Sequence, residues 1–365
     1  MITITRRKMK KTIYKTEVFF LISLFLISSA LSAEELTKEF HKEYTAGTKT
    51  LDINNKYGDV IIQSWDKDQI VIDVKVTVNM SNSEKAQKYL DQIDVQFSEG
   101  TNVISAKTVI ENNFNFNGWG ESKKFSIDYN IKMPAGTDLT LANKYGNTDI
   151  DELHGLMDLD IKYGNITAGK LTRGNIKPLS RLTLAYGKGT INETGWLNLT
   201  ERYVGSMEIE KCQALLLDSK YSKLILGETS SIVGESKYDN IKIENIKNLV
   251  LENGYTEVTI GELTKKLNYT GSYGSFSIDR IPAGFESIDI ETHYMGVNLG
   301  IEESASYKLE AKVSYGGLKY NEDGFKNQRR IVENNSTELS GTVGNEENPS
   351  AKVNVVASYG TVRLN

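Results

Sequence analysis

The chain has 365 residues, a formal net charge of −5 and a single cysteine. Without residues 1–33, which carry six basic residues and one acidic residue, the formal charge becomes −10. This balance argues against nucleic-acid binding, because neutralising phosphates requires a clustered basic face. One cysteine cannot form an internal disulfide, and Cys212 stands in a core position of the pattern described below, so we expect a buried apolar residue rather than a reactive thiol.

Residues 1–33 have the pattern of an export signal. A basic segment precedes the apolar run VFFLISLFLISSA, and small residues follow at Ala30 to Ala33. The run is shorter than the roughly 20 residues that a membrane-spanning helix needs. We therefore expect cleavage after Ala33, export to the periplasm, the outer surface or the extracellular space, and no transmembrane segment.

Residues 34–65 predict a first strand pair or coil. Residues 66–138 predict an insertion whose sequence pattern differs from that of the coils. Ile70 to Val78 alternates apolar and polar residues, and similar strand patterns cover 93–97, 103–109 and 125–133. Between the first two, SNSEKAQKYLDQI predicts a short helix capped by serine or asparagine. We expect this small mixed sheet with its helix to cover unpaired strand edges at the N-terminal end of the array that follows.

A loop inside the insertion, residues 113–120, carries two aromatic residues among asparagine and glycine. Phe116 and Trp119 could contact a ligand, since binding residues concentrate on loops. The alternative is a mobile loop that packs its rings onto the insertion. The sequence leaves both interpretations open.

Residues 139–320 form a repeat array in which each unit is anchored by a tyrosine. From Tyr221 to Tyr273 the tyrosine returns after 17, 17 and 18 residues. Apolar residues lie three, five and usually eight places after each tyrosine, and again six and four places before the next. Spacing by two indicates strands. A fixed period with two short strands per unit predicts an all-β, single-chain β-solenoid with coils of about 17–21 residues.

The tyrosine marks a corner of the coil. The inward-facing positions change parity there, and glycine follows the tyrosine in seven coils, as in Tyr57-Gly58 and Tyr145-Gly146. Because glycine tolerates left-handed and bulged backbone, we assign the change of phase to it. We predict an inward or corner-lining ladder of tyrosine rings spaced by roughly 4.8 Å. The alternative is an exposed aromatic strip that grips sugar rings.

The chain ends with two further predicted segments. Residues 321–350 are rich in Asn, Glu, Arg and Gly and predict a polar loop or hairpin. Residues 351–365 return to the coil pattern around Tyr359, and we expect this terminal strand pair to close the C-terminal end of the solenoid.

Two charged rows precede the tyrosines, and parity turns both rows outward. The residue before the tyrosine is basic in six coils, and the residue three places before it is acidic in five. These rows form either a solvated face of paired charges or a docking strip for an acidic glycan or another envelope protein. Together with Phe116 and Trp119, the candidate ligand contacts are Lys144, Lys162, Arg202, Lys220 and Lys237.

The sequence contains no catalytic, cofactor-binding or metal-binding motif. Carboxylate pairs such as Asp149 with Asp151 and Asp158 with Asp160 could hold calcium or act as the acid and base of a glycosidase. Pairs spaced by two are, however, common on the solvated face of a strand. The three histidines share no metal-ligand spacing, and HExxH, CxxC and serine-nucleophile motifs are absent from the sequence. We therefore predict no catalytic residues, no cofactor and no metal.

The turns resemble those of a known family. The segments LDINNKYGDVIIQSW, LTLANKYGNTDIDELHGLMDLDIKYGNITAGKL and KVNVVASYGTVRLN are similar to the bacterial putative-adhesin family. The resemblance extends from Leu51 to Leu364 and implies an exported β-solenoid of repeated Gly-Asp/Asn-Val/Ile turns. It supplies no catalytic motif. We do not expect the strict tyrosine before the glycine or the helix-containing insertion in every relative.

Two functional hypotheses follow from these patterns. The first is an exported, non-enzymatic envelope or surface protein whose solenoid wall or loops bind a polysaccharide, another protein or a second copy. The second is a β-helix polysaccharide-processing enzyme, a lyase or glycosidase, whose residues come from successive coils and leave no linear motif. A scaffold that extends end to end through its strand edges is a third possibility, which the predicted N-terminal cap argues against.

Overall fold

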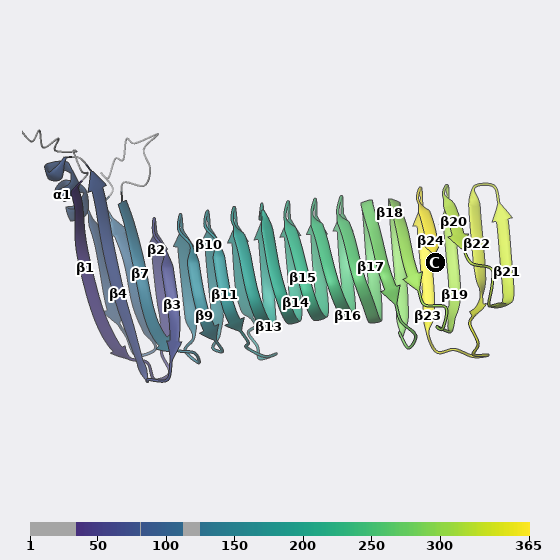
Figure 1. Cartoon of the computed structure of the whole chain (residues 1–365), viewed down its shortest axis with the longest axis horizontal. Coiled ribbons are helices and arrows are strands. Elements are labelled where there is room, and N and C mark those ends of the chain that lie inside the picture. The colour runs from purple at the N-terminus through teal and green to yellow at the C-terminus, as the bar shows by residue number, and fades with distance from the viewer. Residues whose placement is uncertain (1–33, 81, 112–124) are drawn as a thin grey trace, which may run out of the picture.

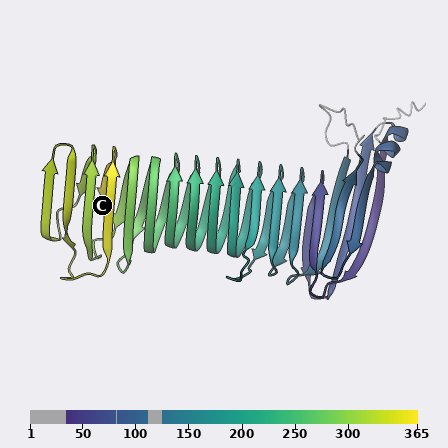
Figure 2. The same cartoon turned by 180° about the vertical axis from the view of Figure 1, so that it is seen from behind.

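The computed structural model describes residues 34–80, 82–111 and 125–365. The predicted export signal and the loop with Phe116 and Trp119 lie outside these ranges. The described chain forms a long solenoid with two faces of parallel strands, and the coils follow one another along a single axis (Figure 1, Figure 2). The predicted all-β solenoid is confirmed.

The coils of the array first use two short strands each and then one long strand that bends from one face into the other. In register, Leu215 pairs with Ile232, Ile232 with Leu249, and Leu249 with Leu267, so equivalent residues form columns along the axis. The strands are β8 Leu139–Lys144, β9 Thr148–Leu153, β10 Met157–Lys162, β11 Ile166–Leu171, β12 Ser180–Ala185, β13 Lys188–Arg202, β14 Ser206–Lys220, β15 Lys223–Lys237, β16 Asn240–Gly254, β17 Glu257–Ile281 and β18 Ser287–Ile301.

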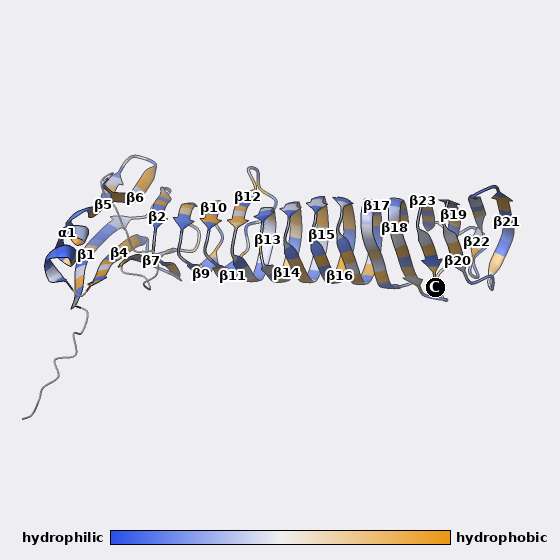
Figure 3. Cartoon of the chain, turned by 90° about the horizontal axis from the view of Figure 1, so that it is seen from above, coloured by the Kyte–Doolittle hydropathy of each residue, from blue (hydrophilic) through white to orange (hydrophobic). Residues whose placement is uncertain are grey.

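The core lies between the two faces. Residues at the predicted apolar positions, such as Leu224, Leu226 and Leu249, are fully buried, while their sequence neighbours point outward. Hydrophobic and hydrophilic residues accordingly alternate along the strands (Figure 3). Burying one such side chain contributes about 1.5–3 kcal/mol, and each coil shares its core only with the coils on either side.

The N-terminal end changes from parallel to antiparallel pairing. β2 Thr50–Lys56 pairs with β8, so the first coil joins the array directly and the insertion extends beyond it. The elements of this end are β1 Glu34–Thr45, β3 Val60–Trp65, β4 Gln69–Met80, α1 Ser83–Asp91, β5 Ile93–Glu99, β6 Val103–Ile110 and β7 Phe125–Pro134. β4 pairs antiparallel with β1 and β7, and β5 pairs antiparallel with β6.

Helix α1 covers part of this end. The side chain of Asn82 accepts a hydrogen bond from the Lys85 amide at 2.8 Å, which confirms the predicted cap. Ala86 and Leu90 are buried in the common hydrophobic core, where the helix packs against β1 and β4. Within the described residues, no helix is long and apolar enough to span a membrane.

The C-terminal end differs from the expectation. Its strands are β19 Tyr307–Ser314, β20 Gly317–Tyr320, β21 Phe325–Glu333, β22 Ser336–Val343, β23 Lys352–Ser358 and β24 Thr361–Leu364. β23 lies between β18 and β19 and pairs with both, so the terminal strand pair does not close the solenoid. The antiparallel hairpin β21–β22 lies at the end instead (Figure 1). The coil-like alternation of β23 suits an interior position, whereas the polar β21 suits a solvent-facing edge.

The tyrosine, and not the glycine, has the left-handed backbone at each corner. All twelve tyrosines of the repeat have φ between 52° and 66°, and the glycines that follow them do not. The glycine is needed for another reason. A Cβ on Gly164 would lie 1.8 Å from the Gly146 carbonyl oxygen, and one on Gly146 would lie 1.8 Å from the Gly58 carbonyl oxygen. The assignment of the left-handed backbone to glycine was therefore wrong. Glycine is required after the tyrosine because neighbouring coils stack too closely there to leave room for a Cβ atom.

The residue after the glycine links neighbouring corners in the first coils. A side-chain oxygen of Asp59 accepts from the Asn147 amide at 2.7 Å, and that of Asn147 accepts from the Asn165 amide at 3.1 Å. The Asn165 side chain in turn accepts from the Lys188 amide at 2.9 Å. These bonds satisfy backbone donors that the turn leaves outside the strand ladder.

Candidate functional site

The twelve repeat tyrosines form one continuous stack along an outer corner of the solenoid. Neighbouring ring centroids are 4.6–5.1 Å apart, and neighbouring planes differ by 1–20°. The exposed fraction of each tyrosine lies between 38% and 59%. The predicted ladder is therefore present at the corner, but it faces outward. In chain-axis order it consists of Tyr57, Tyr145, Tyr163, Tyr186, Tyr203, Tyr221, Tyr238, Tyr255, Tyr273, Tyr294, Tyr359 and Tyr315.

Because the rings are stacked, mainly their edges are exposed to solvent. A sugar binds an aromatic residue through the ring face, and inside the stack both faces are covered by neighbours. At one end Tyr57 is also covered by Phe125, with ring centroids 5.2 Å apart. At the other end Tyr315 contacts only Tyr359 among the described rings and is the most exposed, at 59%. The stack as a whole is thus not a sugar-gripping strip, and only its Tyr315 end offers a ring face.

The predicted basic row runs beside the stack and points outward, and three of its members are engaged locally. The Lys144 ammonium lies 4.8 Å from the centroid of Tyr145 and 5.5 Å from that of Tyr163. A hydrogen bond with Tyr145 is the main cause that raises the pKa of Lys144. Lys162 pairs with Asp160 at 2.8 Å, and Arg202 pairs with Asp218 at 2.5 Å. These contacts fit a solvated face of partly paired charges.

Lys220 and Lys237 remain as a pair of neighbouring cations. They lie opposite one another in register on β14 and β15. Neither has an ion pair within the described part of the chain. Of the candidate ligand contacts, the structure therefore brings these two together as unpaired charges, while Phe116 and Trp119 lie outside the described residues.

A buried polar layer lies under the tyrosine corner of the middle coils. Ser219 donates to a Glu201 carboxyl oxygen at 3.1 Å, and Ser236 donates to Asp239 at 2.6 Å. Glu201 is fully buried, and its second oxygen has no hydrogen-bond partner among the described residues. Burial, with a smaller contribution from Asp239, raises the pKa of Glu201 to about 8, so this carboxyl is neutral at pH 7.

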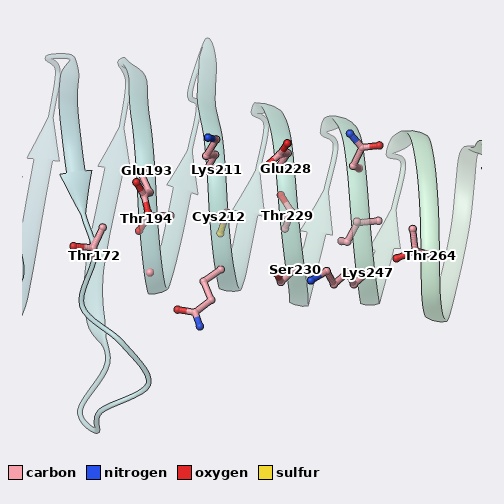
Figure 4. A pocket seen from close by; sticks show the side chains of 14 residues that line it. Thr172, Glu193, Thr194, Lys211, Cys212, Glu228, Thr229, Ser230, Lys247 and Thr264 are labelled. Atoms are coloured by element: carbon pink, nitrogen blue, oxygen red, sulfur yellow. The ribbon is translucent and has the colours of Figure 1, made fainter.

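The other bend of the coils carries a groove of about 560 Å³ that crosses β13 to β16 (Figure 4). Its floor is formed by small residues, including Thr194, Cys212 and Thr229, where the next coils have Ile246 and Leu263 in the same column. Smaller side chains leave the corner hollow. The full lining is Thr172, Glu193, Thr194, Gly195, Lys211, Cys212, Gln213, Glu228, Thr229, Ser230, Asn245, Ile246, Lys247 and Thr264.

The groove is polar and has balanced charge. Along one rim Glu193, Lys211, Glu228 and Asn245 follow one another in register, so acidic and basic groups alternate. Gln213, Ser230, Lys247 and Thr264 contribute amide, hydroxyl and ammonium groups. On the floor, the Thr229 hydroxyl is buried and has no partner among the described residues. The groove thus offers both donors and acceptors over several coils.

The thiol in this groove is unreactive. Cys212 is buried, and burial raises its pKa to about 12, so the nucleophilic thiolate does not form at neutral pH. This agrees with the expectation of a buried apolar residue.

The carboxylate pairs considered in the sequence lie elsewhere and have local partners. Arg181 binds both oxygens of Asp158, at 2.9 and 2.5 Å, and Ser64 donates to Asp151 at 3.0 Å. Among the described residues, no group of three or more His, Cys, Asp or Glu side chains is arranged to hold a metal ion.

The groove was not predicted from the sequence. Its only signal is a change of residue size in one column, where Thr194, Cys212 and Thr229 replace larger apolar residues. In a single sequence such changes look like ordinary variation of a repeat. Their effect is seen only when the columns are aligned along the axis.

No family model and no curated protein matches the chain. Among solved structures, it is similar to a putative cell adhesion protein from Clostridium sporogenes, with 14% identity, a TM-score of 0.20 and coverage of 90% of this chain and 98% of the other. It is also similar to two proteins from Parabacteroides distasonis. For a putative adhesin the identity is 12% and the TM-score 0.28, with 72% and 97% covered. For a putative lipid binding protein the identity is 11% and the TM-score 0.30, with 72% and 96% covered.

Two of these three structures are described as putative adhesion proteins. The low identities and TM-scores carry no argument about ligands. The fold rests on the strand pairing described above.

Proposed function

We propose that this protein is an exported, non-enzymatic binding protein of the cell envelope or surface, and that its groove holds an extended polysaccharide chain. The groove is the observation that carries this proposal. It crosses four coils, each advancing roughly 4.8 Å along the axis, which is close to the length of one sugar residue. Its alternating charges, amides and hydroxyls match the mixed donors and acceptors of sugar hydroxyls.

The adhesin-like role also draws on the sequence. The predicted export signal and the turns that resemble the putative-adhesin family support export from the cytoplasm in this proposal. The unpaired Lys220 and Lys237 would add contacts with acidic groups of a glycan or of another envelope protein.

The experiment is a screen of the purified protein against bacterial and host polysaccharides, in which retained binding and new reducing or unsaturated ends are both recorded. Lys211→Ala combined with Gln213→Ala should weaken binding at least tenfold, because it removes a donor from each side of the groove. Lys242→Ala is the matched control, since Lys242 is exposed on the outer face of β16 away from the groove. Equal binding by all three proteins contradicts the proposal.

A second candidate function, a polysaccharide lyase or glycosidase, is favoured by one observation. Glu193 and Glu228 line the same groove from alternate coils, on either side of Lys211. New chain ends that disappear in Glu193→Gln or Glu228→Gln would establish this enzyme in place of the binding protein. Binding without product supports the non-enzymatic function.

A further inference from the structure

The Tyr315 end of the stack opens into a second cleft, of about 340 Å³, on another part of the molecule. It is lined by Lys312, Ser314, Tyr315, Ile331, Glu333, Asn334, Asn335, Ser336 and Glu338. These residues come from β19, from the turn that follows it, and from the hairpin β21–β22. The cleft is separate from the groove, with which it shares no residue.

The hairpin replaces a coil at this end without supplying a ring. Inside the array, the amide of each tyrosine donates to the carbonyl that precedes the next tyrosine, as Tyr203 does to Lys220 at 3.1 Å. The Tyr315 amide donates instead to Asn335 in the hairpin turn, at 2.6 Å. The turn lies level with the row of corner turns along the upper edge of Figure 1. The backbone hydrogen bond of the tyrosine amide is thus preserved at Tyr315. The hairpin supplies no tyrosine ring to stack on Tyr315, and the cleft lies beside Tyr315 instead.

Strand register turns the polar side chains of the hairpin toward this cleft. Ser314 lies opposite Ser336, and Lys312 lies opposite Glu338, with which it forms an ion pair at 2.7 Å. Ile331 and Glu333 of β21 pair with Glu338 and Ser336 of β22, which places all of them on one face. The cleft therefore combines the ring of Tyr315, which has a stacked ring neighbour on one side only among the described residues, with carboxylate, ammonium, amide and hydroxyl groups around it.

We propose that this cleft is a binding site for a single saccharide ring, which stacks its C–H face on Tyr315 and takes the position of the next ring in the column. Glu333 and Glu338 accept from the sugar hydroxyls, and Asn334 and Ser336 can both donate and accept. An apolar ring face with polar groups only at its rim is the chemistry of a pyranose, whereas a purely aromatic guest would leave these polar groups unused. This site does not depend on binding in the groove.

The test is a titration of the purified protein with neutral hexasaccharides of glucose and of N-acetylglucosamine, followed calorimetrically and by saturation-transfer NMR. Tyr315→Ala should weaken binding of the responding oligosaccharide about tenfold, the loss expected for one stacking contact. Tyr315→Phe keeps the ring face and should bind within twofold of the natural protein. Since Tyr315→Ala could uncover Tyr359, Ser336→Trp provides a second variant that fills the cleft and should also weaken binding about tenfold.

Lys242→Ala is the matched control, because Lys242 is exposed on β16, does not line the cleft and uncovers no ring face, so this variant should leave binding unchanged. Natural binding by both Tyr315→Ala and Ser336→Trp overturns the inference, as does the absence of binding by any hexasaccharide. The groove variants separate the two proposals. If Lys211→Ala with Gln213→Ala loses binding while the cleft variants retain it, the proposed function stands and the Tyr315 site is refuted. The converse result refutes the groove and supports this site.

Discussion

The tyrosines combine an unfavourable backbone with a favourable stack. A residue other than glycine in the left-handed region costs about 1–3 kcal/mol, and twelve tyrosines adopt it. Each stacked pair contributes about 0.5–1.5 kcal/mol beyond the area that it buries. An interior tyrosine has two stacked neighbours, so the two effects are of similar size. The stack therefore explains why the corner can hold tyrosine where asparagine or glycine would be easier.

Replacing one interior tyrosine should separate these effects. Tyr221→Asn relieves the cost of the left-handed backbone and removes both stacking contacts, two effects that roughly offset one another. It also removes the buried half of the tyrosine ring, so we expect a net loss of about 1–3 kcal/mol in the free energy of unfolding. Tyr221→Phe keeps the ring and should change that free energy by less than about 0.5 kcal/mol. Chemical denaturation measures both values. An asparagine variant as stable as the natural protein would contradict the role assigned to the stack.

The buried carboxyl of Glu201 makes stability depend on pH. Its pKa is about 8 in the folded protein and 4.5 for the free side chain. Below pH 4.5 both states hold the proton. Between these values only the unfolded state loses it, so stability falls as pH rises, at up to about 1.4 kcal/mol per pH unit, and levels off above pH 8. We expect a total loss of about 3–5 kcal/mol between pH 4.5 and pH 8.

Glu201→Gln should remove most of this slope, since a neutral amide replaces the titrating group. Asp239, whose pKa burial also raises, accounts for a remaining part. Glu210→Gln, at an exposed position of the neighbouring strand β14, should leave the slope unchanged. Denaturation midpoints measured from pH 5 to pH 9 decide between these outcomes, and a slope retained in Glu201→Gln would show that other groups cause it.

The strand edges at the two ends of the solenoid are covered by different elements. A parallel coil that ends the array leaves one strand edge on each face unpaired, and such edges invite association. At the N-terminus, antiparallel strands and α1 extend beyond the first coil. At the C-terminus, β22 pairs with the last coil and buries Leu339, while β21 presents polar residues to solvent.

The C-terminal hairpin should be needed to keep the protein monodisperse. Leu339 is 1% exposed, so Leu339→Asp would bury a charge, detach the hairpin and uncover the edge of β19. We expect concentration-dependent association in light scattering and a loss of several kcal/mol in stability. Val332→Asp, at a residue that is 59% exposed in the same hairpin, should leave the protein monodisperse and stable. Equal behaviour of the two variants would refute the capping role.

The whole molecule is a rod in which contacts are mostly between neighbouring coils (Figure 1). In such a structure stability is close to a sum of coil and interface contributions, and a local defect spreads only as far as the adjacent coils remain coupled. The rigid axis keeps the groove, the basic row and the tyrosine stack in constant register. Under the proposed function we therefore expect ligands that repeat along their length to suit this shape best.

Gly164→Ala should reveal this local coupling. Its Cβ would lie 1.8 Å from the Gly146 carbonyl oxygen, so the two coils must separate, at a cost of about 3 kcal/mol or more. Hydrogen exchange should accelerate in β8 to β13 and remain unchanged in β17 and β18. Gly136→Ala, where no atom lies within 4 Å of the added Cβ, should exchange like the natural protein. Uniform acceleration along the rod would indicate a single cooperative unit instead.

Local patterns in the sequence were sufficient for the coils. The alternation before and after Tyr221 and Tyr238 identified strands and their inward faces, because burial between two sheets imposes a period of two. The Asn82 cap was visible for the same local reason. The orientation of the tyrosine was not, since parity cannot show that the left-handed residue is the tyrosine itself or that its ring turns outward.

What the sequence by itself determined is therefore the solenoid, its coil length and the columns of buried and outward residues, since these follow from contacts that repeat with the chain. Only the tertiary structure decided the place of β23 between β18 and β19, the groove over Thr194 and Cys212, and the free face of Tyr315. Each depends on which coil lies next to which, and on the size of side chains that meet across coils. Those relations are set by packing in space and leave no pattern along the chain.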